Sequence, residues 1–212
     1  MSEIKDKSIQ IFLDELASKS ATPGGGSVSA LMGAQSVALI SMVCHLTIGK
    51  PKYAEVEYEM QALLEEAEAL REKLVNLIKA DIEVFNQLMG AYSLPKETDA
   101  EKSARTEAIQ AVLKTATEIP LECARACAKA VELSRYAAEK GSLGVISDAG
   151  AAVMAAYSGL KSAALNVYIN TGSLKDREFA ESTLTELEGI LKDVDVAAEA
   201  VYQLVKGKLK MI

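Results

Sequence analysis

A single carboxylate interrupts the apolar stripe of a long predicted helix. The stripe passes through Leu70, Leu74 and the pair Leu77/Ile78, and the next position on the same face is Asp81. A carboxylate on an apolar face must be paired, or its pKa rises because burial disfavours the charged form. Two interpretations stay open: a buried ion pair on a stripe that drifts, or a general acid or base tuned by burial.

Three consecutive glycines, Gly24, Gly25 and Gly26, stand between Pro23 and a run without charged side chains. At a helix start, backbone N–H groups and the positive end of the helix dipole can face a ligand. Glycine also removes the side chains that would keep a flat ligand away from the backbone. The alternative is a flexible turn with Ser27 as helix N-cap. The pattern is neither a Walker A loop nor GxGxxG after a strand, so nucleotide binding is not indicated.

Several other polar residues have both a structural and a functional interpretation. Asp148 at a predicted helix start suits an N-cap better than a catalyst. Asn166 and Asn170, four residues apart, share a helix face and either line a polar pocket or pair with nearby backbone. Lys50 and Lys52 flank a proline in a turn, where they are either solvated or in contact with an anion.

Metal and nucleophilic chemistry find little support in the sequence. His45 is the single histidine and lies on a helix predicted to be apolar all round, which favours a core residue over a catalyst. Cys123 and Cys127 are four residues apart, but no further Cys or His completes a metal site. A G-x-S-x-G motif is also absent. We therefore expect no metal and no cofactor.

The composition is typical of a soluble helical protein. Half of the 212 residues are hydrophobic, only 5% are aromatic, and there is no tryptophan. A net charge of -7 without a Lys/Arg block argues against nucleic-acid binding. Three cysteines fit a reducing compartment, and the charged N-terminus does not resemble a signal peptide, so we expect a cytoplasmic location.

The elements that position these residues are all predicted to be helices. We expect an all-α bundle of five or six long helices in one domain spanning residues 1–212, without strands. Thr98 with Glu101 predicts a capping box, Pro120 a kink, Gly141 a helix end, and Ser147 or Asp148 a cap. The predicted helices cover residues 4–18, 27–47, 54–91, 98–140, 147–170 and 174–205.

One segment is also compatible with a membrane span. Residues 21–49 contain no Asp, Glu, Lys or Arg, and about 20 apolar residues suffice to cross a bilayer. Serine, glutamine, histidine and threonine within the run, and the lack of flanking aromatic residues, favour a central helix surrounded by other helices. We therefore expect no membrane partner.

With these residues in view, the sequence resembles the cyclodeaminase family. That family comprises the C-terminal domain of formiminotransferase-cyclodeaminase and stand-alone bacterial relatives, some of them methenyltetrahydrofolate cyclohydrolases. The resemblance spans nearly the whole chain and rests on five motifs in the family's order. They are "TPGGGSVSAL", "LTIGKPKY", "DIEVFNQLMGAYSLPKET", the "IPL" of the fourth helix, and "SDAGAAVMAA…ALNVYIN".

The resemblance implies an all-helical fold, at least a homodimer, and a reduced folate as substrate. It assigns acid/base catalysis to Asp81 and makes the glycines with Ser27 part of the folate pocket. More weakly, it implies four further pocket residues: Lys50, Asn86, Asp148 and Asn166. No formiminotransferase domain is expected before this chain, and whether one acts as a separate partner stays open.

The resemblance leaves two reactions and one non-catalytic alternative open. In cyclodeamination, N10 attacks the formimino carbon and ammonia leaves; in cyclohydrolysis, water opens 5,10-methenyl-tetrahydrofolate to the 10-formyl compound. Each needs a proton taken from the nucleophile and one given to the departing nitrogen, which one buried carboxylate can do in turn. The alternative is a helical protein that binds a folate or a partner without turnover.

Overall fold

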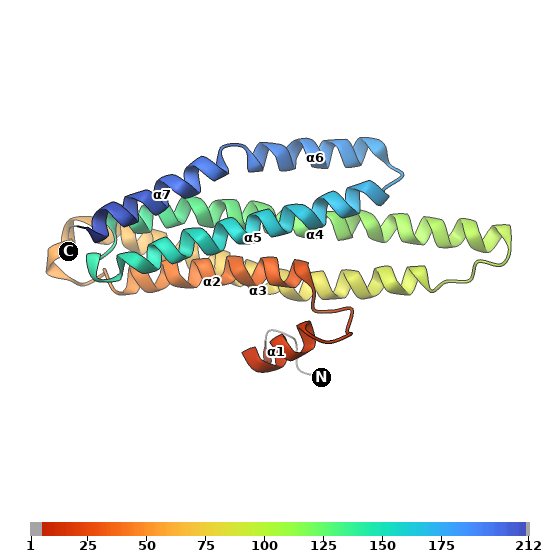
Figure 1. The fold of residues 1–212 in the computed structure, drawn as a ribbon, viewed down its shortest axis with the longest axis horizontal. Helices are drawn as coiled ribbons and strands as arrows, with labels where there is room; N and C mark the ends of the chain where they lie inside the picture. The colour runs from red at the N-terminus through yellow and green to blue at the C-terminus, as the bar shows by residue number, and fades with distance from the viewer. Residues whose placement is uncertain (1–5, 211–212) are drawn as a thin grey trace.

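The regular structure of the protein is helical throughout residues 6–210, the part that this computed structural model describes (Figure 1). Two short 3-10 helices, Pro51–Val56 and Leu143–Val145, link the longer elements. The prediction of an all-α bundle is confirmed; residues 4 and 5 of the first predicted helix lie outside the described part. The α-helices are α1 (Ile9–Leu16), α2 (Gly25–His45), α3 (Glu57–Tyr92), α4 (Asp99–Lys140), α5 (Ile146–Ser173), α6 (Arg177–Leu191) and α7 (Val194–Leu209).

Two predicted helix starts are wrong and one is confirmed. The Thr98 side chain and Glu101 form the expected capping box at α4. Helix α2 begins at Gly25 with Gly24 as N-cap, rather than with Ser27 as cap, because the Gly24 carbonyl already accepts a helical hydrogen bond. Helix α5 follows a 3-10 turn directly, so its N-cap is Val145 and neither Ser147 nor Asp148 caps it.

The last predicted helix is in fact two helices. Helix α6 ends at Leu191 and α7 begins at Val194, with Asp193 between them in the left-handed region at φ 64°. Aspartate tolerates this conformation better than most residues, although glycine is the usual choice. The break carries neither glycine nor proline, which is why the sequence pattern continued through it.

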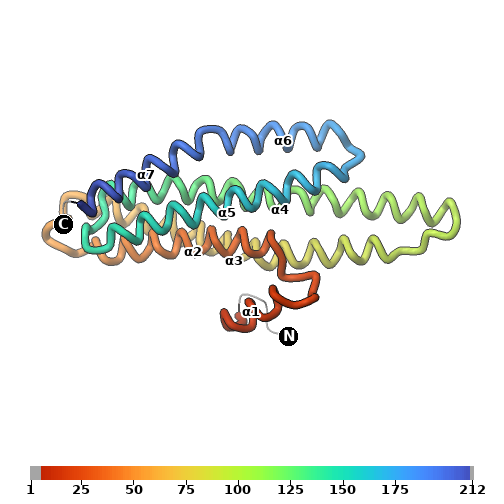
Figure 2. The backbone as a smooth tube through the Cα atoms, in the orientation of Figure 1, coloured from red at the N-terminus to blue at the C-terminus, as the bar shows by residue number. Residues whose placement is uncertain are grey.

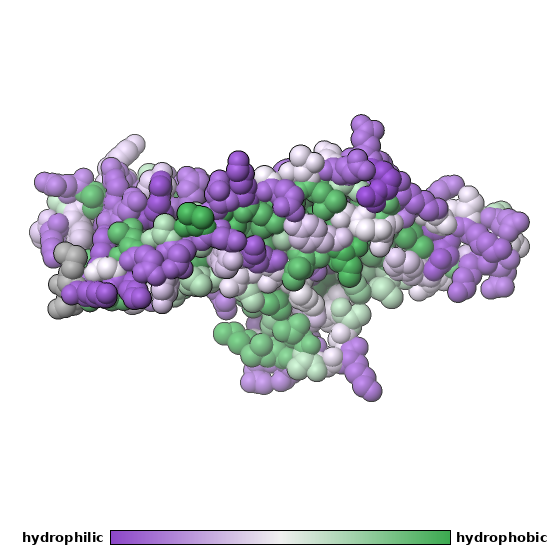
Figure 3. All heavy atoms as spheres, turned by 45° about the horizontal axis from the view of Figure 1, so that its top comes forward, coloured by the Kyte–Doolittle hydropathy of each residue, from purple (hydrophilic) through white to green (hydrophobic). Residues whose placement is uncertain are grey.

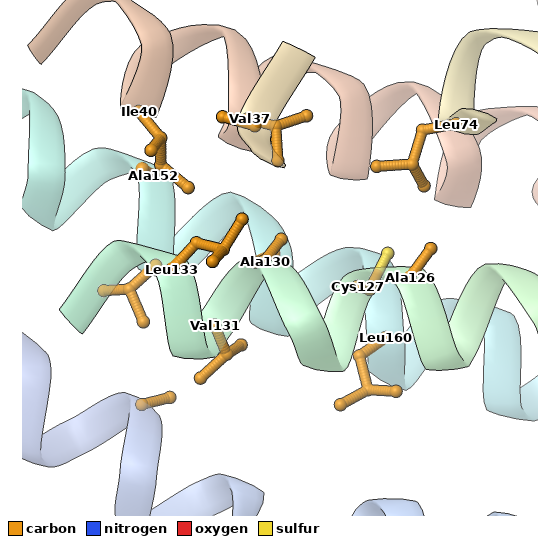
Figure 4. Packing of buried hydrophobic residues seen from close by; sticks show 14 of the residues in the cluster. Val37, Ile40, Leu74, Ala126, Cys127, Ala130, Val131, Leu133, Ala152 and Leu160 are labelled. Carbon is orange, nitrogen blue, oxygen red and sulfur yellow. The ribbon is translucent and has the colours of Figure 1, made fainter. Parts of the chain in front are cut away.

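Helix α2 packs against α3, α4 and α5 and runs antiparallel to α3 and α5 (Figures 1 and 2). Its small residues allow close approach: a β-carbon at Gly159 of α5 would lie 2.9 Å from the Ser29 carbonyl oxygen and 3.2 Å from the Gly33 nitrogen. Around this contact the core fills with Val37, Leu74 and Cys127, seen together in Figure 4. Small residues therefore set the spacing of the helices that carry the candidate site.

Helices α3 and α4 form the longest hairpin and extend beyond the other helices at one end (Figure 1). Ion pairs join their outer faces, among them Lys129–Glu66 at 2.9 Å and Lys73–Glu122. Helix α4 is one continuous helix that includes the predicted kink residue, Pro120. Gly141 is its C-cap as expected, and there a β-carbon would overlap the backbone of Ala137 and the side chain of Val43.

Large apolar side chains are in contact with solvent at several places, among them helix α1 and the outer face of α5. Helix α1 lies off the bundle, and its Ile9 and Leu13 are 79% and 50% exposed (Figures 2 and 3). On the outer face of α5, Leu165 and Ile169 are 67% and 71% exposed. Phe12 is the buried residue of α1, so most of the apolar face of this helix is uncovered by the chain itself.

Two helical segments are long and apolar enough to cross a membrane by length and composition, Gly25–His45 and Leu143–Ser173. In their most apolar windows, 61% and 44% of the residues are buried inside the protein. The first is helix α2, and its packing against three other helices explains its apolar character. The absence of a membrane partner and the cytoplasmic location stay predictions.

The contact at Gly159 generates a first prediction. Gly159→Ala should destabilise the protein by about 1–3 kcal/mol, because the new methyl group meets α2 backbone that cannot move aside. The matched control is Gly172→Ala in the same helix, where nothing lies within 4 Å of an added β-carbon. Urea unfolding followed by circular dichroism should show the loss for Gly159→Ala alone. Equal stabilities of the two variants would contradict this account of the packing.

Candidate functional site

The site is built where α3 presents Asp81 to the first turn of α2. The Ser27 hydroxyl donates a 2.7 Å hydrogen bond to Oδ2 of Asp81. Burial raises the pKa of Asp81 above its ordinary value, and hydrogen bonds from the side chain and backbone of Ser27 oppose part of that rise. In the part of the chain that the structure describes, no Lys or Arg forms an ion pair with Asp81. The carboxylate is therefore desolvated without a compensating cation, which is the condition that tunes an acid/base group.

Glycine at position 26 is required by the carboxylate itself. A β-carbon at Gly26 would overlap the Asp81 carboxylate, so the side chain of α3 rests directly on the backbone of α2. Gly25 and Gly24 face different surroundings. Within 4 Å, an added β-carbon at Gly25 would meet only the Asn166 amide, and one at Gly24 only the Ala21 carbonyl oxygen. The first two glycines thus leave backbone open to an incoming molecule, while the third makes room for Asp81.

A small cavity lies against Asp81 between α2, α3, α4 and α5. Its volume is about 10 Å³, close to the space that one water molecule requires. A pterin ring cannot enter a space of this size, so a folate would have to bind outside it, against the glycine backbone. The lining residues are Gly26, Ser29, Ala30, Leu77, Asp81, Ile119, Pro120, Cys123 and Ala163.

Sequence reasoning missed the α4 wall of this cavity. Pro120 and Cys123 are three residues apart and therefore share a helix face, and the face they share is the one that meets Asp81. The pKa of Cys123 is raised well above its ordinary range by its contact with Cys127 and by burial, so the thiol is neutral. The "IPL" sequence was the available signal, and only the packing shows what it lines.

The predicted pocket residues fall into two groups. Gly24–Gly26, Ser27 and Asn166 lie with Asp81, whereas Lys50 and Asp148 lie at the other end of α2 and α5. Lys50 Nζ donates to Ser142 Oγ at 3.2 Å, beside the start of α5 where Asp148 occupies the first turn. Helix α2 has 21 residues and is about 30 Å long, so one chain does not bring these two groups together.

Asn86 lies on α3 beyond Asp81, and its side chain is exposed to solvent. Asn166 is half-buried and donates to the Ser162 carbonyl at 2.9 Å, which leaves its amide oxygen available. Among residues 6–210, no group of three or more His, Cys, Asp and Glu side chains is arranged to hold a metal ion. The one carboxylate that lines the cavity is that of Asp81, held by the Ser27 hydroxyl group.

Known proteins share both this sequence and this fold. The sequence model of the formiminotransferase-cyclodeaminase family matches residues 8–189. A methenyltetrahydrofolate cyclohydrolase of Methylorubrum extorquens is 53% identical over 204 residues, which are 96% of this chain and 98% of that protein. A formimidoyltransferase-cyclodeaminase of Rattus norvegicus is 33% identical over 92% of this chain and 36% of its own length.

A solved structure agrees with these sequences. The crystal structure of formiminotetrahydrofolate cyclodeaminase from Thermotoga maritima superposes with a TM-score of 0.82, at 32% identity over 98% of both chains. The chain therefore belongs to the formiminotransferase-cyclodeaminase family, as its sequence motifs predicted.

The raised pKa of Asp81 generates a prediction about stability. Because the pKa is higher in the folded than in the unfolded chain, ionisation of Asp81 costs folding free energy above the folded pKa. Asp81→Asn should therefore be more stable than the wild type at pH 7, by about 1.4 kcal/mol for each unit between the two pKa values. The difference should shrink as the pH falls and vanish below the unfolded pKa.

Urea unfolding at several pH values measures this difference. Glu83→Gln is the matched control, since Glu83 is an exposed carboxylate on the same helix, paired with Lys79 at 3.8 Å. It should show no gain at pH 7. If Asp81→Asn were instead the less stable protein at pH 7, the carboxylate would be stabilised by the fold and its proposed tuning would be wrong.

Proposed function

We propose that this protein is a methenyltetrahydrofolate cyclohydrolase. It is an enzyme of the cyclodeaminase and cyclohydrolase group that acts on tetrahydrofolate derivatives. The observation that carries the proposal is the uncompensated carboxylate of Asp81 beside a water-sized cavity and an open glycine backbone. The sequence identity to the bacterial cyclohydrolase is 53%, against 32–33% for the two cyclodeaminases compared above. This difference favours hydrolysis of the methenyl compound over deamination of the formimino compound.

In the proposed reaction, ionised Asp81 acts first as a general base. It takes one proton from water while the water oxygen bonds to the carbon that bridges N5 and N10. The raised pKa makes this carboxylate a stronger base than an exposed one. The cavity against Asp81 is large enough for that one water molecule.

Asp81 then acts as a general acid. It gives the proton to N5 as the bond between N5 and the carbon breaks. The new hydroxyl group loses its proton to solvent water as the formyl carbonyl forms on N10, which accounts for the one proton that the reaction of the cationic substrate releases. Ser27 keeps the carboxylate in one orientation through both steps, since its hydroxyl bonds Oδ2 and leaves Oδ1 to exchange the proton. While ionised, the carboxylate also stabilises the positive charge of the methenyl substrate. Proton transfer of this kind needs no metal or redox cofactor.

The pterin is proposed to lie on the open side of Gly24 and Gly25. Among residues 6–210, the side-chain atoms within 4 Å of a β-carbon added at Gly24 or Gly25 are those of the Asn166 amide, whose oxygen could accept from a pterin N–H. No side-chain hydrogen bond caps the N-terminal turn of α2, so N–H groups of this turn could donate to the substrate. Asn86, exposed further along α3, is proposed to contact the part of the folate beyond the pterin.

We also propose a homodimer in which the two ends of α2 serve one site. Lys50 and Asp148 cannot reach Asp81 of the same chain, so they can act on its substrate only from a second copy. The exposed apolar residues of α1 and α5, among them Ile9, Leu165 and Ile169, support an assembly that covers them. Lys50 would then meet the anionic glutamate tail of the folate.

Cyclodeamination is the second candidate, favoured by the whole-length likeness to the Thermotoga maritima enzyme. The same carboxylate could take a proton from N10 and give it to the departing ammonia. A chain that binds folate without turnover is the remaining alternative. The substrates distinguish the three, because the formimino compound is consumed in one reaction and the methenyl compound in the other.

A spectrophotometric comparison tests the proposal. Purified protein should accelerate the loss of 5,10-methenyl-tetrahydrofolate absorbance and should not form that compound from 5-formimino-tetrahydrofolate. Asp81→Asn should lower kcat by about 10²–10⁴-fold, since proton transfer then falls to water, while the helical circular dichroism is kept. Glu83→Gln, the exposed neighbour on α3, should retain wild-type kcat.

Formation of the methenyl compound from the formimino substrate would instead identify a cyclodeaminase. Tight binding without turnover of either compound would identify a binding protein. A wild-type level of kcat in Asp81→Asn would remove Asp81 from the mechanism, whichever reaction occurs.

The proposed role of Lys50 has its own test. Lys50→Ala should raise KM for a polyglutamylated substrate up to about fivefold, with a smaller effect for the monoglutamate and none on kcat, because exposed ion pairs contribute up to about 1 kcal/mol. Light scattering should give the mass of a dimer. Lys175, which is exposed beyond the end of α5 and belongs to neither group, provides the control variant Lys175→Ala. A monomer with unchanged KM values would contradict the shared site.

A further inference from the structure

Pro120 leaves one carbonyl of α4 without its helical partner. In a continuous α-helix, the N–H of residue 120 would donate to the carbonyl of Ala116, but proline has no N–H. Ala116 is itself buried, so water does not readily replace the lost donor. A buried carbonyl of this kind requires a partner from elsewhere in the protein.

Helix α5 supplies that partner. Asn170 Nδ2 donates to the Ala116 carbonyl oxygen at 2.6 Å, across 54 residues of sequence. The side chain of a neighbouring helix thus replaces the backbone bond that Pro120 removes. This decides between the two interpretations of Asn170 from the sequence: its amide pairs with backbone and does not line the cavity.

The bond lies next to the proposed catalytic carboxylate. The segment that Asn170 holds continues directly into Ile119, Pro120 and Cys123, which are the α4 wall of the cavity at Asp81. On α5, Asn170 lies one turn beyond Asn166 and two turns beyond Ala163, which is the α5 residue of the same cavity. One hydrogen bond therefore ties the two walls opposite Asp81 to each other.

We infer that Asn170 is a positioning residue, which holds the α4 wall of the cavity at its distance from Asp81 by bonding the carbonyl that Pro120 leaves free. This inference rests on the proposed function of Asp81. Without the bond, the freed carbonyl would turn towards water and the wall would shift, and the water and the bridging carbon would lose their alignment with the carboxylate. A displacement of about 1 Å at a reacting centre can cost about 10²-fold in rate.

A double-mutant cycle with Pro120 tests the inference. Asn170→Ala should lower kcat by about 10–10²-fold with a change in KM of less than about threefold, since the wall acts on alignment more than on folate binding. Pro120→Ala restores an N–H that can donate to Ala116 within α4. In that background, Asn170→Ala should therefore cost less than about twofold in kcat and should lower Tm by less than it does alone.

Gln110→Ala is the matched control. Gln110 is also an amide on the α4–α5 interface: its Nε2 donates to the Ser173 carbonyl at 3.0 Å, and its Oε1 accepts from Lys175 N at 2.6 Å. It lies ten residues from Pro120, about 15 Å along α4. Its loss should lower Tm without lowering kcat. Asn170→Ser, with a polar side chain too short for Ala116, replaces Asn170→Ala if the alanine variant does not fold.

The outcomes separate the inference from the proposed function. If Asn170→Ala lowered kcat equally in the wild-type and Pro120→Ala backgrounds, the inference that Asn170 replaces the N–H missing at Pro120 would be overturned. If Asn170→Ala lowered Tm but left kcat unchanged, Asn170 would have a purely structural role. A wild-type protein inactive towards both folates would refute the proposed function, and the role of the wall with it. The Tm cycle would still report whether Asn170 and Pro120 are coupled.

Discussion

The hydrogen bond between Ser27 and Asp81 is the interaction on which the rest of the site depends. It joins the first turn of α2 to the middle of α3, and it is possible only because Gly26 offers no side chain to the carboxylate. Burial makes the charged form of Asp81 costly, and Ser27 recovers part of that cost. The result is a carboxylate held in one place with a pKa above its ordinary value.

Small residues hold this arrangement together over a longer range. Gly159 meets the backbone of α2 at Ser29, two residues after Ser27, which bonds Asp81, so α5 approaches α2 closely at that level. The closeness brings Asn166 to the glycine turn and Ala163 to the cavity. The uncharged character of α2 suits the same geometry, because its buried residues pack against three other helices, although a stripe that includes Gln35, Ala38 and His45 meets solvent.

The sequence predicted the helices and Asp81 because both follow from periodicity, which is local. An acidic residue on an apolar stripe is visible in any window of a few turns, as is the capping box at Thr98. The break at Asp193 was not predictable, since no glycine or proline marks it. The cavity wall at Pro120 and Cys123 depends on which face of α4 meets α3. The separation between Lys50 and Asp81 depends on the direction in which α2 runs. Both are properties of helix packing, which a local sequence pattern does not contain.

The separation between Lys50 and Asp81 limits how one chain can bind a long substrate. A folate has a planar pterin at one end and an anionic tail at the other, and a single chain places the two regions proposed to bind them, the glycine turn and Lys50, about 30 Å apart at opposite ends of α2. A two-fold axis that sets two antiparallel α2 helices side by side would bring the glycine end of each copy close to the lysine end of the other. Because the interface of a two-fold dimer is the same patch on both copies, one set of contacts would complete two sites at once.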